Sequence, residues 1–192
     1  MTFSRLVKIP VLGNILIILN SYAFCGDARS GEEFAGAKNW GKSFGIQFIV
    51  ATSMAFLCHN VSYSDATLPG ELIISIFPSL LGFGIGVYAL IFSLKSTIIR
   101  ELQKTFIDDL QPNPKPGSAL ILNAEMATPL LIALGTITIG ILQKIFPYAN
   151  SLSIISWTAL WASIIFMIEL IITLFGLGEN AILKQLPEEK EE

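Results

Sequence analysis

The chain has 192 residues, of which 53% are hydrophobic and only 14% are charged, and its mean hydropathy is +0.65. Such a composition excludes an ordinary soluble domain and predicts one membrane domain over residues 1–192, an all-α polytopic bundle of transmembrane helices. The net charge of −3 is small, and four of the 15 acidic residues lie together in the tail at residues 180–192, so we expect no direct binding of nucleic acid.

The first apolar segment, residues 9–25, is shorter than the roughly 20 residues that a spanning helix needs. Gly13 and Asn14 are followed seven residues later by Asn20 and Ser21, which places a narrow polar stripe on an otherwise apolar helix. Such a helix can lie in the membrane interface or re-enter the membrane. We therefore expect an N-terminal membrane-associated helix; the alternative is a true span that turns this stripe into the bundle.

Four later segments are long and apolar enough to cross a bilayer. These segments are residues 43–63, 72–94, 118–142 and 152–177. The sequence therefore predicts four spans plus the N-terminal helix, with five spans as the alternative.

Lysine and arginine are distributed unevenly among the connections between these spans. Residues 26–42, residues 95–117 and the tail carry most of them, whereas residues 64–71 carry none and residues 143–151 carry only Lys144. Because cytoplasmic loops are the ones enriched in these residues, we expect the first three regions and both termini in the cytoplasm. An N-terminus on that side also requires that residues 9–25 do not cross.

The predicted cytoplasmic loop, residues 95–117, begins with a segment whose apolar residues recur at helical spacing and ends in a proline-rich stretch. One interpretation is a short helix that docks a cytosolic partner, and the other is a helix that lies along the lipid surface. The basic residues that we expect to contact a partner are Lys95, Arg100 and Lys104.

Three glycines in the second span, Gly82, Gly84 and Gly86, include a GxxxG pair. Small residues let two membrane helices approach closely, and close packing is what holds helices together where lipid removes the hydrophobic drive. These glycines are therefore candidates for a helix contact, either within the chain or between copies of it.

The predicted spans also contain two carboxylates, Glu125 and Glu169. A charged residue at this depth costs roughly 2.5–3.5 kcal/mol on insertion scales, and the rise of about 1.5 Å per residue places both at a similar level above the cytoplasmic edge. With Asn123 and Thr128 beside Glu125, we expect an intramembrane polar cluster. It could serve as a cation site or proton relay, or as hydrogen-bonded glue between helices.

The sequence shows no Ser/His/Asp set, no phosphate-binding loop and no pair of catalytic carboxylates in the loops. Cys25 and Cys58 form no CxxC motif, and His59 is the single histidine, which is too little for a metal site. We therefore expect no catalytic residues, no cofactor and no metal, and hence no enzyme.

Residues 77–94, FPSLLGFGIGVYALIFSL, are followed by a charged segment. This arrangement resembles a group of small bacterial membrane proteins that includes the membrane subunit of the Kiwa anti-phage defence system. The resemblance implies a four-helix homotetramer in the bacterial inner membrane that works with a cytosolic, DNA-binding effector to sense infection. Only Gly82, Gly84 and Gly86 map onto it, and no active site transfers.

Two functions are compatible with these features. The first is a non-enzymatic, homo-oligomeric scaffold or sensor that recruits a cytosolic effector through residues 95–117, the first cytoplasmic loop and the tail. The second is a small cation or proton channel that uses Glu125 and Glu169.

Overall fold

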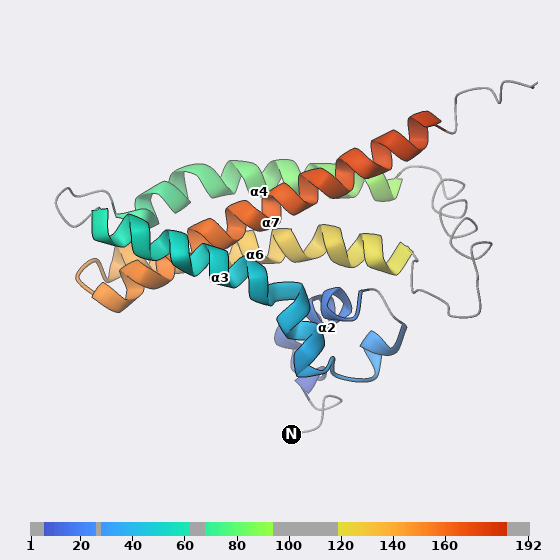
Figure 1. Ribbon diagram of the computed structural model, residues 1–192, viewed down its shortest axis with the longest axis horizontal. Helices are drawn as coiled ribbons and strands as arrows, with labels where there is room; N and C mark the ends of the chain where they lie inside the picture. The colour runs from blue at the N-terminus through green and yellow to red at the C-terminus, as the bar shows by residue number, and fades with distance from the viewer. Residues whose placement is uncertain (1–5, 26–27, 62–67, 94–118, 184–192) are drawn as a thin grey trace, which may run out of the picture.

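The computed structural model of the protein describes residues 6–25, 28–61, 68–93 and 119–183. In chain order its elements are α2 (Leu12–Ala23), η1 (Ala28–Gly31), α3 (Ala37–Val61), α4 (Pro69–Ser93), α6 (Ala119–Ile145) and α7 (Asn150–Leu183). All regular structure in these ranges is helical (Figure 1). The predicted all-α fold is confirmed.

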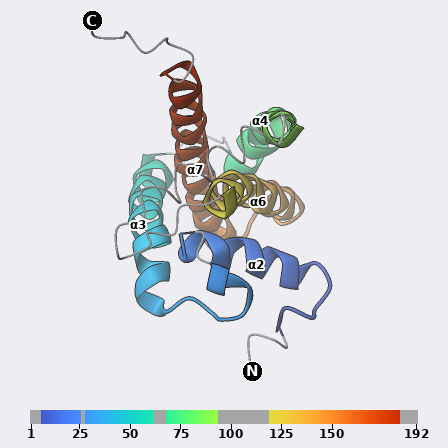
Figure 2. The same ribbon diagram turned by 90° about the vertical axis from the view of Figure 1, so that its right-hand side faces the viewer.

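Four of the helices, α3, α4, α6 and α7, are long and apolar enough to cross a membrane, with candidate spans of 24, 24, 25 and 30 residues. The 12 residues of α2 extend only about 18 Å, which is less than the roughly 30 Å of a hydrocarbon core. Figure 2, which looks along the long axis of the bundle, shows α2 from the side, running obliquely across the other helices. The structure therefore has the predicted four spans plus one shorter apolar helix, and the five-span alternative is not supported.

The four long helices are longer than the apolar segments from which we predicted them, whereas α2, with 12 residues, is shorter than the predicted segment 9–25. Helix α3 begins at Ala37 rather than at residue 43, and α7 continues to Leu183 rather than ending at residue 177. Hydropathy identifies only the part of a helix that suits hydrocarbon, whereas helical hydrogen bonding continues through polar residues outside that part.

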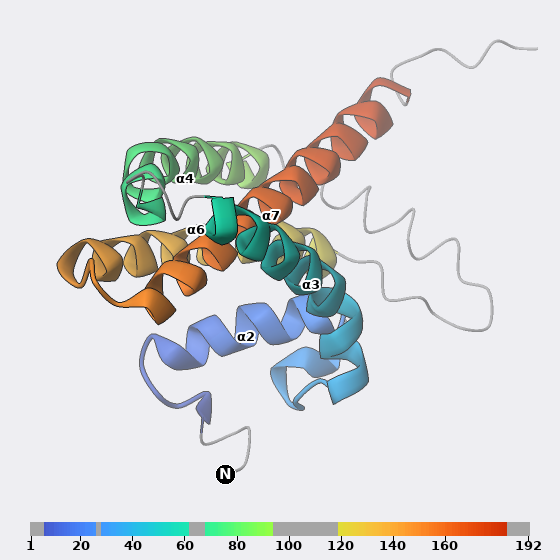
Figure 3. The same cartoon turned by 60° about the vertical axis from the view of Figure 1, so that its left-hand side comes forward.

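The four long helices are arranged so that α7 contacts α3 and α6, and α6 in turn contacts α4. Helix α2 packs against α6 and α3. Figures 1 and 3 show α2 on the side of the bundle opposite α4. The N-terminal helix therefore packs against the bundle on the side away from α4.

The packing between α4 and α6 depends on small residues at the Pro69 end of α4. A side chain at Gly70 or Gly140 would collide with the opposite helix, because a Cβ on Gly70 would lie 2.9 Å from the carbonyl oxygen of Gly140. The backbone N–H of Gly70 also donates a 2.7 Å hydrogen bond to Oε1 of the buried Gln143. Close backbone approach with a polar bond across the interface is typical of helix pairs in membranes.

The core consists of two clusters. One joins α3, α4, α6 and α7, and its buried members are Ala55, Ile73, Phe77, Ala133, Trp157 and Leu160. Beside it, the Thr136 and Ser163 hydroxyls form a 2.6 Å hydrogen bond between α6 and α7. The other cluster joins α2 and its connection to α3 and α7 through Ala23, Ala35, Phe44 and Phe166. Many large apolar side chains, such as Ile46 and Phe83, remain exposed, as lipid-facing residues must be.

A candidate functional site: the polar network around Glu169

Side chains from three helices meet at the carboxylate of Glu169 on α7. The Tyr22 hydroxyl of α2 donates a 2.8 Å hydrogen bond to Oε2, and Nε2 of Gln47 on α3 donates a 2.8 Å hydrogen bond to Oε1. Each carboxylate oxygen therefore has a neutral donor. Such donors stabilise a carboxylate in a low-dielectric environment without adding a second charge.

The position of Tyr22 depends on Asn20, which is fully buried two residues earlier in α2. Its Nδ2 donates hydrogen bonds of 2.7 Å to the carbonyl oxygens of Ser30 and Glu33, and its Oδ1 accepts a 2.8 Å bond from the backbone N–H of Ala35. These three bonds hold the connection to α3 against the end of α2. They explain why Asn20, which lies at one end of the polar stripe seen in the sequence, is buried.

An aromatic cluster surrounds the Tyr22 ring. The ring centroids of Tyr22 and Phe44 are 5.1 Å apart, those of Tyr22 and Phe166 are 6.1 Å apart, and those of Phe44 and Phe166 are 5.8 Å apart. Trp40 stacks on Phe44 with a centroid separation of 5.1 Å. Each aromatic pair contributes about 0.5–1.5 kcal/mol beyond its buried area, so this cluster fixes the direction of the Tyr22 hydroxyl.

The second carboxylate, Glu125 on α6, is less completely bonded. Its Oε2 lies 3.5 Å from the Thr173 hydroxyl, at the limit of a hydrogen bond. Glu125 also lines a cavity of about 120 Å³ whose other walls are Tyr22, Cys25, Ser43, Ile121 and Ala124. The cavity therefore places Glu125 beside the phenol that binds Glu169.

Burial raises the pKa of Tyr22 above its ordinary value, and the hydrogen bond to Glu169 and the negative charges of Glu169 and Glu125 raise that pKa further. The phenol consequently keeps its proton and acts as a donor to Glu169. The two carboxylates thus lie within electrostatic reach of one phenol.

The structure divides the predicted polar cluster into separate parts. Glu125 and Glu169 both lie near Tyr22, whereas Asn123 is exposed and its Oδ1 accepts a 2.7 Å hydrogen bond from the Tyr88 hydroxyl of α4. Thr128 is fully buried, and its hydroxyl has no hydrogen-bond partner within the described part of the chain.

Tyr22 and Gln47 belong to this network although the sequence analysis did not select them. Gln47 could have been found, because an amide inside an apolar span requires a polar partner. Tyr22 offered no such signal, since tyrosine is common at the ends of membrane helices without any special role.

The three candidate glycines of α4 have different surroundings. A Cβ on Gly84 would meet Leu130 of α6, so Gly84 is used for packing within the chain. Gly82 and Gly86 are exposed, and a Cβ on either would have no atom within 4 Å. The candidate docking residues Lys95, Arg100 and Lys104 lie outside the described residues.

Within the described ranges, no group of three or more histidine, cysteine, aspartate or glutamate residues could hold a metal ion. Cys25 is exposed, and the Cys58 sulfur accepts a 3.3 Å hydrogen bond from Nε1 of Trp161. The fold and this network define a polytopic α-helical membrane protein with an internal hydrogen-bond network. No protein family, characterised protein or solved structure matches the chain.

Proposed function

We propose that this protein is a non-enzymatic, homo-oligomeric scaffold or sensor of the bacterial inner membrane that recruits a cytosolic effector. The observation that carries the proposal is the exposed small-residue face of α4, which includes Gly82 and Gly86. The proposal also draws on the resemblance to the Kiwa membrane subunit, from which the tetramer and the role in anti-phage defence follow as expectations.

The face of α4 continues on both sides of the two glycines. Ser75, Ser79, Gly82, Gly86 and Ala89 recur at spacings of four and three residues, and all are exposed. A stripe of small residues at this spacing allows a second helix to approach along several turns. Gly84, by contrast, already contacts α6, which leaves the exposed face for a second copy of the chain.

The network around Glu169 supports a scaffold more than a conducting path. Both oxygens of Glu169 are bonded, to Tyr22 of α2 and Gln47 of α3. A carboxylate that ties three helices together through neutral donors stabilises one arrangement of the bundle. A rigid bundle is suited to presenting cytoplasmic segments to a partner.

The oligomer can be tested by replacing Gly82 and Gly86 together with isoleucine and measuring the mass of the detergent-solubilised protein. We expect the intact protein to have the mass of a tetramer and the variant to have that of a monomer, because the branched side chains separate the helices. Gly135→Ile is the matched control, since Gly135 is an exposed glycine of α6 at which an added Cβ would have no atom within 4 Å. An unchanged mass in the double variant, or a monomeric intact protein, would contradict the proposal.

The effector contact can be tested separately by co-purification with a soluble protein encoded beside this one. Deletion of residues 182–192 together with charge reversal at Lys95, Arg100 and Lys104 should release that protein while the oligomer mass stays the same. Retention of the soluble protein after these changes would show that these segments are not the docking surface.

The second candidate function is a cation or proton conductor, and the observation that favours it is the cavity beside Glu125. It predicts ion flux from the intact protein in liposomes and loss of that flux in the Glu125→Gln and Glu169→Gln double variant with assembly retained. Absence of flux from the intact protein would remove this candidate.

A further inference from the structure

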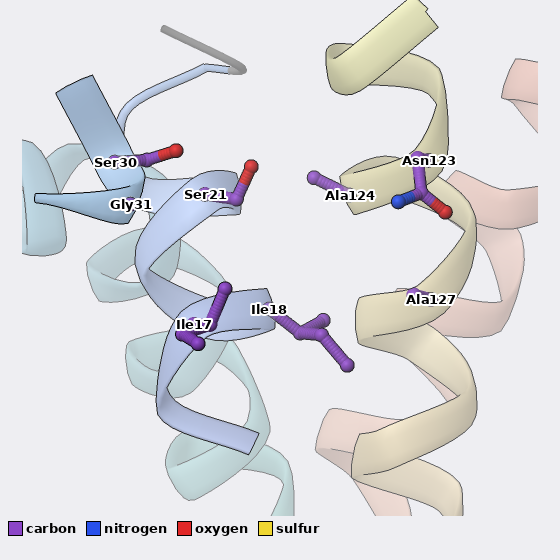
Figure 4. A pocket seen from close by; sticks show the side chains of 8 residues that line it. All are labelled: Ile17, Ile18, Ser21, Ser30, Gly31, Asn123, Ala124 and Ala127. Carbon is purple, nitrogen blue, oxygen red and sulfur yellow. The ribbon is translucent and has the colours of Figure 1, made fainter. Parts of the chain in front are cut away.

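A second cavity, of about 250 Å³, lies between α2 and α6 (Figure 4). It is distinct from the cavity at Glu125, although both share Ala124. The residues that line it are Ile17, Ile18, Ser21, Ser30, Gly31, Asn123, Ala124 and Ala127. None of these residues carries a charge, so the cavity offers no side chain of opposite charge to an ionic ligand.

The lining of this cavity changes from polar to apolar along its length. Figure 4 shows Ser21, Ser30 and Asn123 toward one end, and Ile17, Ile18 and Ala127 toward the other. The Asn123 side chain has its Oδ1 occupied by the Tyr88 hydroxyl, so the N–H groups of its amide remain to donate elsewhere. In Figure 4 the amide nitrogen lies on the side of Asn123 that faces α2. The polar end therefore offers an amide and two hydroxyls as neutral donors.

The depth of these donors follows from the length of α6. Its 27 residues extend about 40 Å, which matches a bilayer of about 40–45 Å including the headgroup regions. Asn123 lies four residues after Ala119, or about 6 Å along the axis, where the headgroup region gives way to hydrocarbon. Ala127 lies about 12 Å along, inside the hydrocarbon. The polar end of the cavity thus lies at the level of the headgroups, and its apolar end lies at the level of the hydrocarbon.

We propose that this cavity binds the glycerol-ester region of a diacyl phospholipid from the leaflet at the Ala119 end of α6. The ester carbonyl oxygens accept hydrogen bonds from Ser21, Ser30 and Asn123, and the first part of one acyl chain lies against Ile17, Ile18 and Ala127. Pockets that enclose a whole drug-sized ligand measure about 300–1,000 Å³. The smaller volume of this cavity therefore suits one segment of a lipid whose remainder stays in the bilayer.

The neutral donors also predict which part of the lipid matters. Because the lining has no cation, binding does not depend on the charge of the headgroup, and phosphatidylglycerol and phosphatidylethanolamine should bind equally well. A free fatty acid has no glycerol esters and should bind more weakly. This proposal does not depend on the oligomer contact of α4 or on an effector.

The test uses the full-length protein in nanodiscs that contain a diacyl phospholipid with a photoreactive diazirine near the ester end of one acyl chain. We expect cross-links to concentrate on the peptides that contain Ile17, Ile18 and Ala127. Ala127→Phe fills the apolar end and should abolish this concentration, and Gly135→Phe, which points into open space on the same helix, should leave it intact. Cross-links that spread evenly over lipid-facing residues, or that persist in Ala127→Phe, would overturn the proposal.

A second variant tests the proposal independently, in case Ala127→Phe does not fold. Ser21→Ala with Ser30→Ala removes two donors and almost no packing volume, and we expect cross-linking to fall by about two- to tenfold for each lost hydrogen bond. Ser53→Ala is the matched control, because the Ser53 hydroxyl bonds the carbonyl oxygen of Ile49 on the exposed side of α3. Unchanged cross-linking in the double variant, or stronger labelling by a photoreactive fatty acid, would contradict the assignment.

Discussion

Tyr22 and Glu169 are separated by 147 positions in the chain, and the Tyr22 hydroxyl donates a 2.8 Å hydrogen bond to Oε2 of Glu169. This bond connects the short N-terminal helix to the longest helix of the bundle. Because an intramembrane carboxylate without partners is costly, the bond links the position of α2 to the stability of the whole bundle.

Removal of the Tyr22 hydroxyl should therefore destabilise the protein. Tyr22→Phe keeps the ring that packs against Phe44 and Phe166 but leaves one oxygen of Glu169 without its donor. We expect a loss of about 1–3 kcal/mol in the free energy of unfolding, measured by denaturant titration in detergent micelles. Tyr148→Phe is the control, since Tyr148 is 96% exposed and its replacement should change little. Equal stabilities for the two variants would show that the bond contributes nothing.

The raised pKa of Tyr22 predicts a distinct response to alkaline pH. A phenol whose pKa is higher in the folded state than in the unfolded state stabilises the fold below the ordinary pKa of about 10. As pH rises above that value, the unfolded chain loses the proton first, so stability falls. In a variant with Tyr22 as its single tyrosine, ultraviolet absorbance should detect tyrosinate only together with unfolding, whereas ionisation near pH 10 in the folded protein would contradict the assigned environment.

The hydrogen bond between Gln47 of α3 and Glu169 of α7 can be tested by exchanging the amide and the carboxylate between these two positions. Glu169→Gln removes the carboxylate and places an amide N–H where one acceptor oxygen was, so the Tyr22 hydroxyl or the Gln47 amide must turn to accept a hydrogen bond instead of donating one. Gln47→Glu places two carboxylates side by side. The double variant restores one carboxylate and one amide at the same contact, and we expect it to recover a large part of the stability that each single variant loses. Additive losses, with no recovery in a double-mutant cycle, would mean that the two side chains do not interact.

Asn20 should control the connection between α2 and α3. Asn20→Ala removes three hydrogen bonds to residues 30–35 and leaves those backbone groups without partners. We expect faster hydrogen exchange and faster proteolytic cleavage in residues 28–36. Asn14→Ala, at an exposed position of the same helix, is the control and should leave both rates unchanged. Protection of residues 28–36 in Asn20→Ala would show that other contacts hold the connection.

The sequence was sufficient to predict the helical fold because the apolar segments are long and the requirement for internal hydrogen bonding in lipid leaves few alternatives. It also identified Glu125 and Glu169, since charge within an apolar segment is rare. It could not predict that Tyr22 and Gln47 bond Glu169, because those contacts depend on the rotation of each helix about its own axis. The same limit applies to Gly82, Gly84 and Gly86, whose different surroundings follow from which side of α4 meets α6.

Substitution of Gly140 tests whether the close approach of the two helix backbones holds α4 against α6. A Cβ at this position would lie 2.7 Å from Cγ2 of Ile73, which is itself fully buried and cannot move away freely. We expect Gly140→Ala to destabilise the protein by about 1–3 kcal/mol through overpacking, despite the higher helix propensity of alanine. Gly135→Ala on the same helix meets open space and should be neutral or stabilising by up to about 1 kcal/mol. The two variants make the same chemical change, so a difference of sign between them isolates the helix contact, and equal effects in denaturant titration would exclude it.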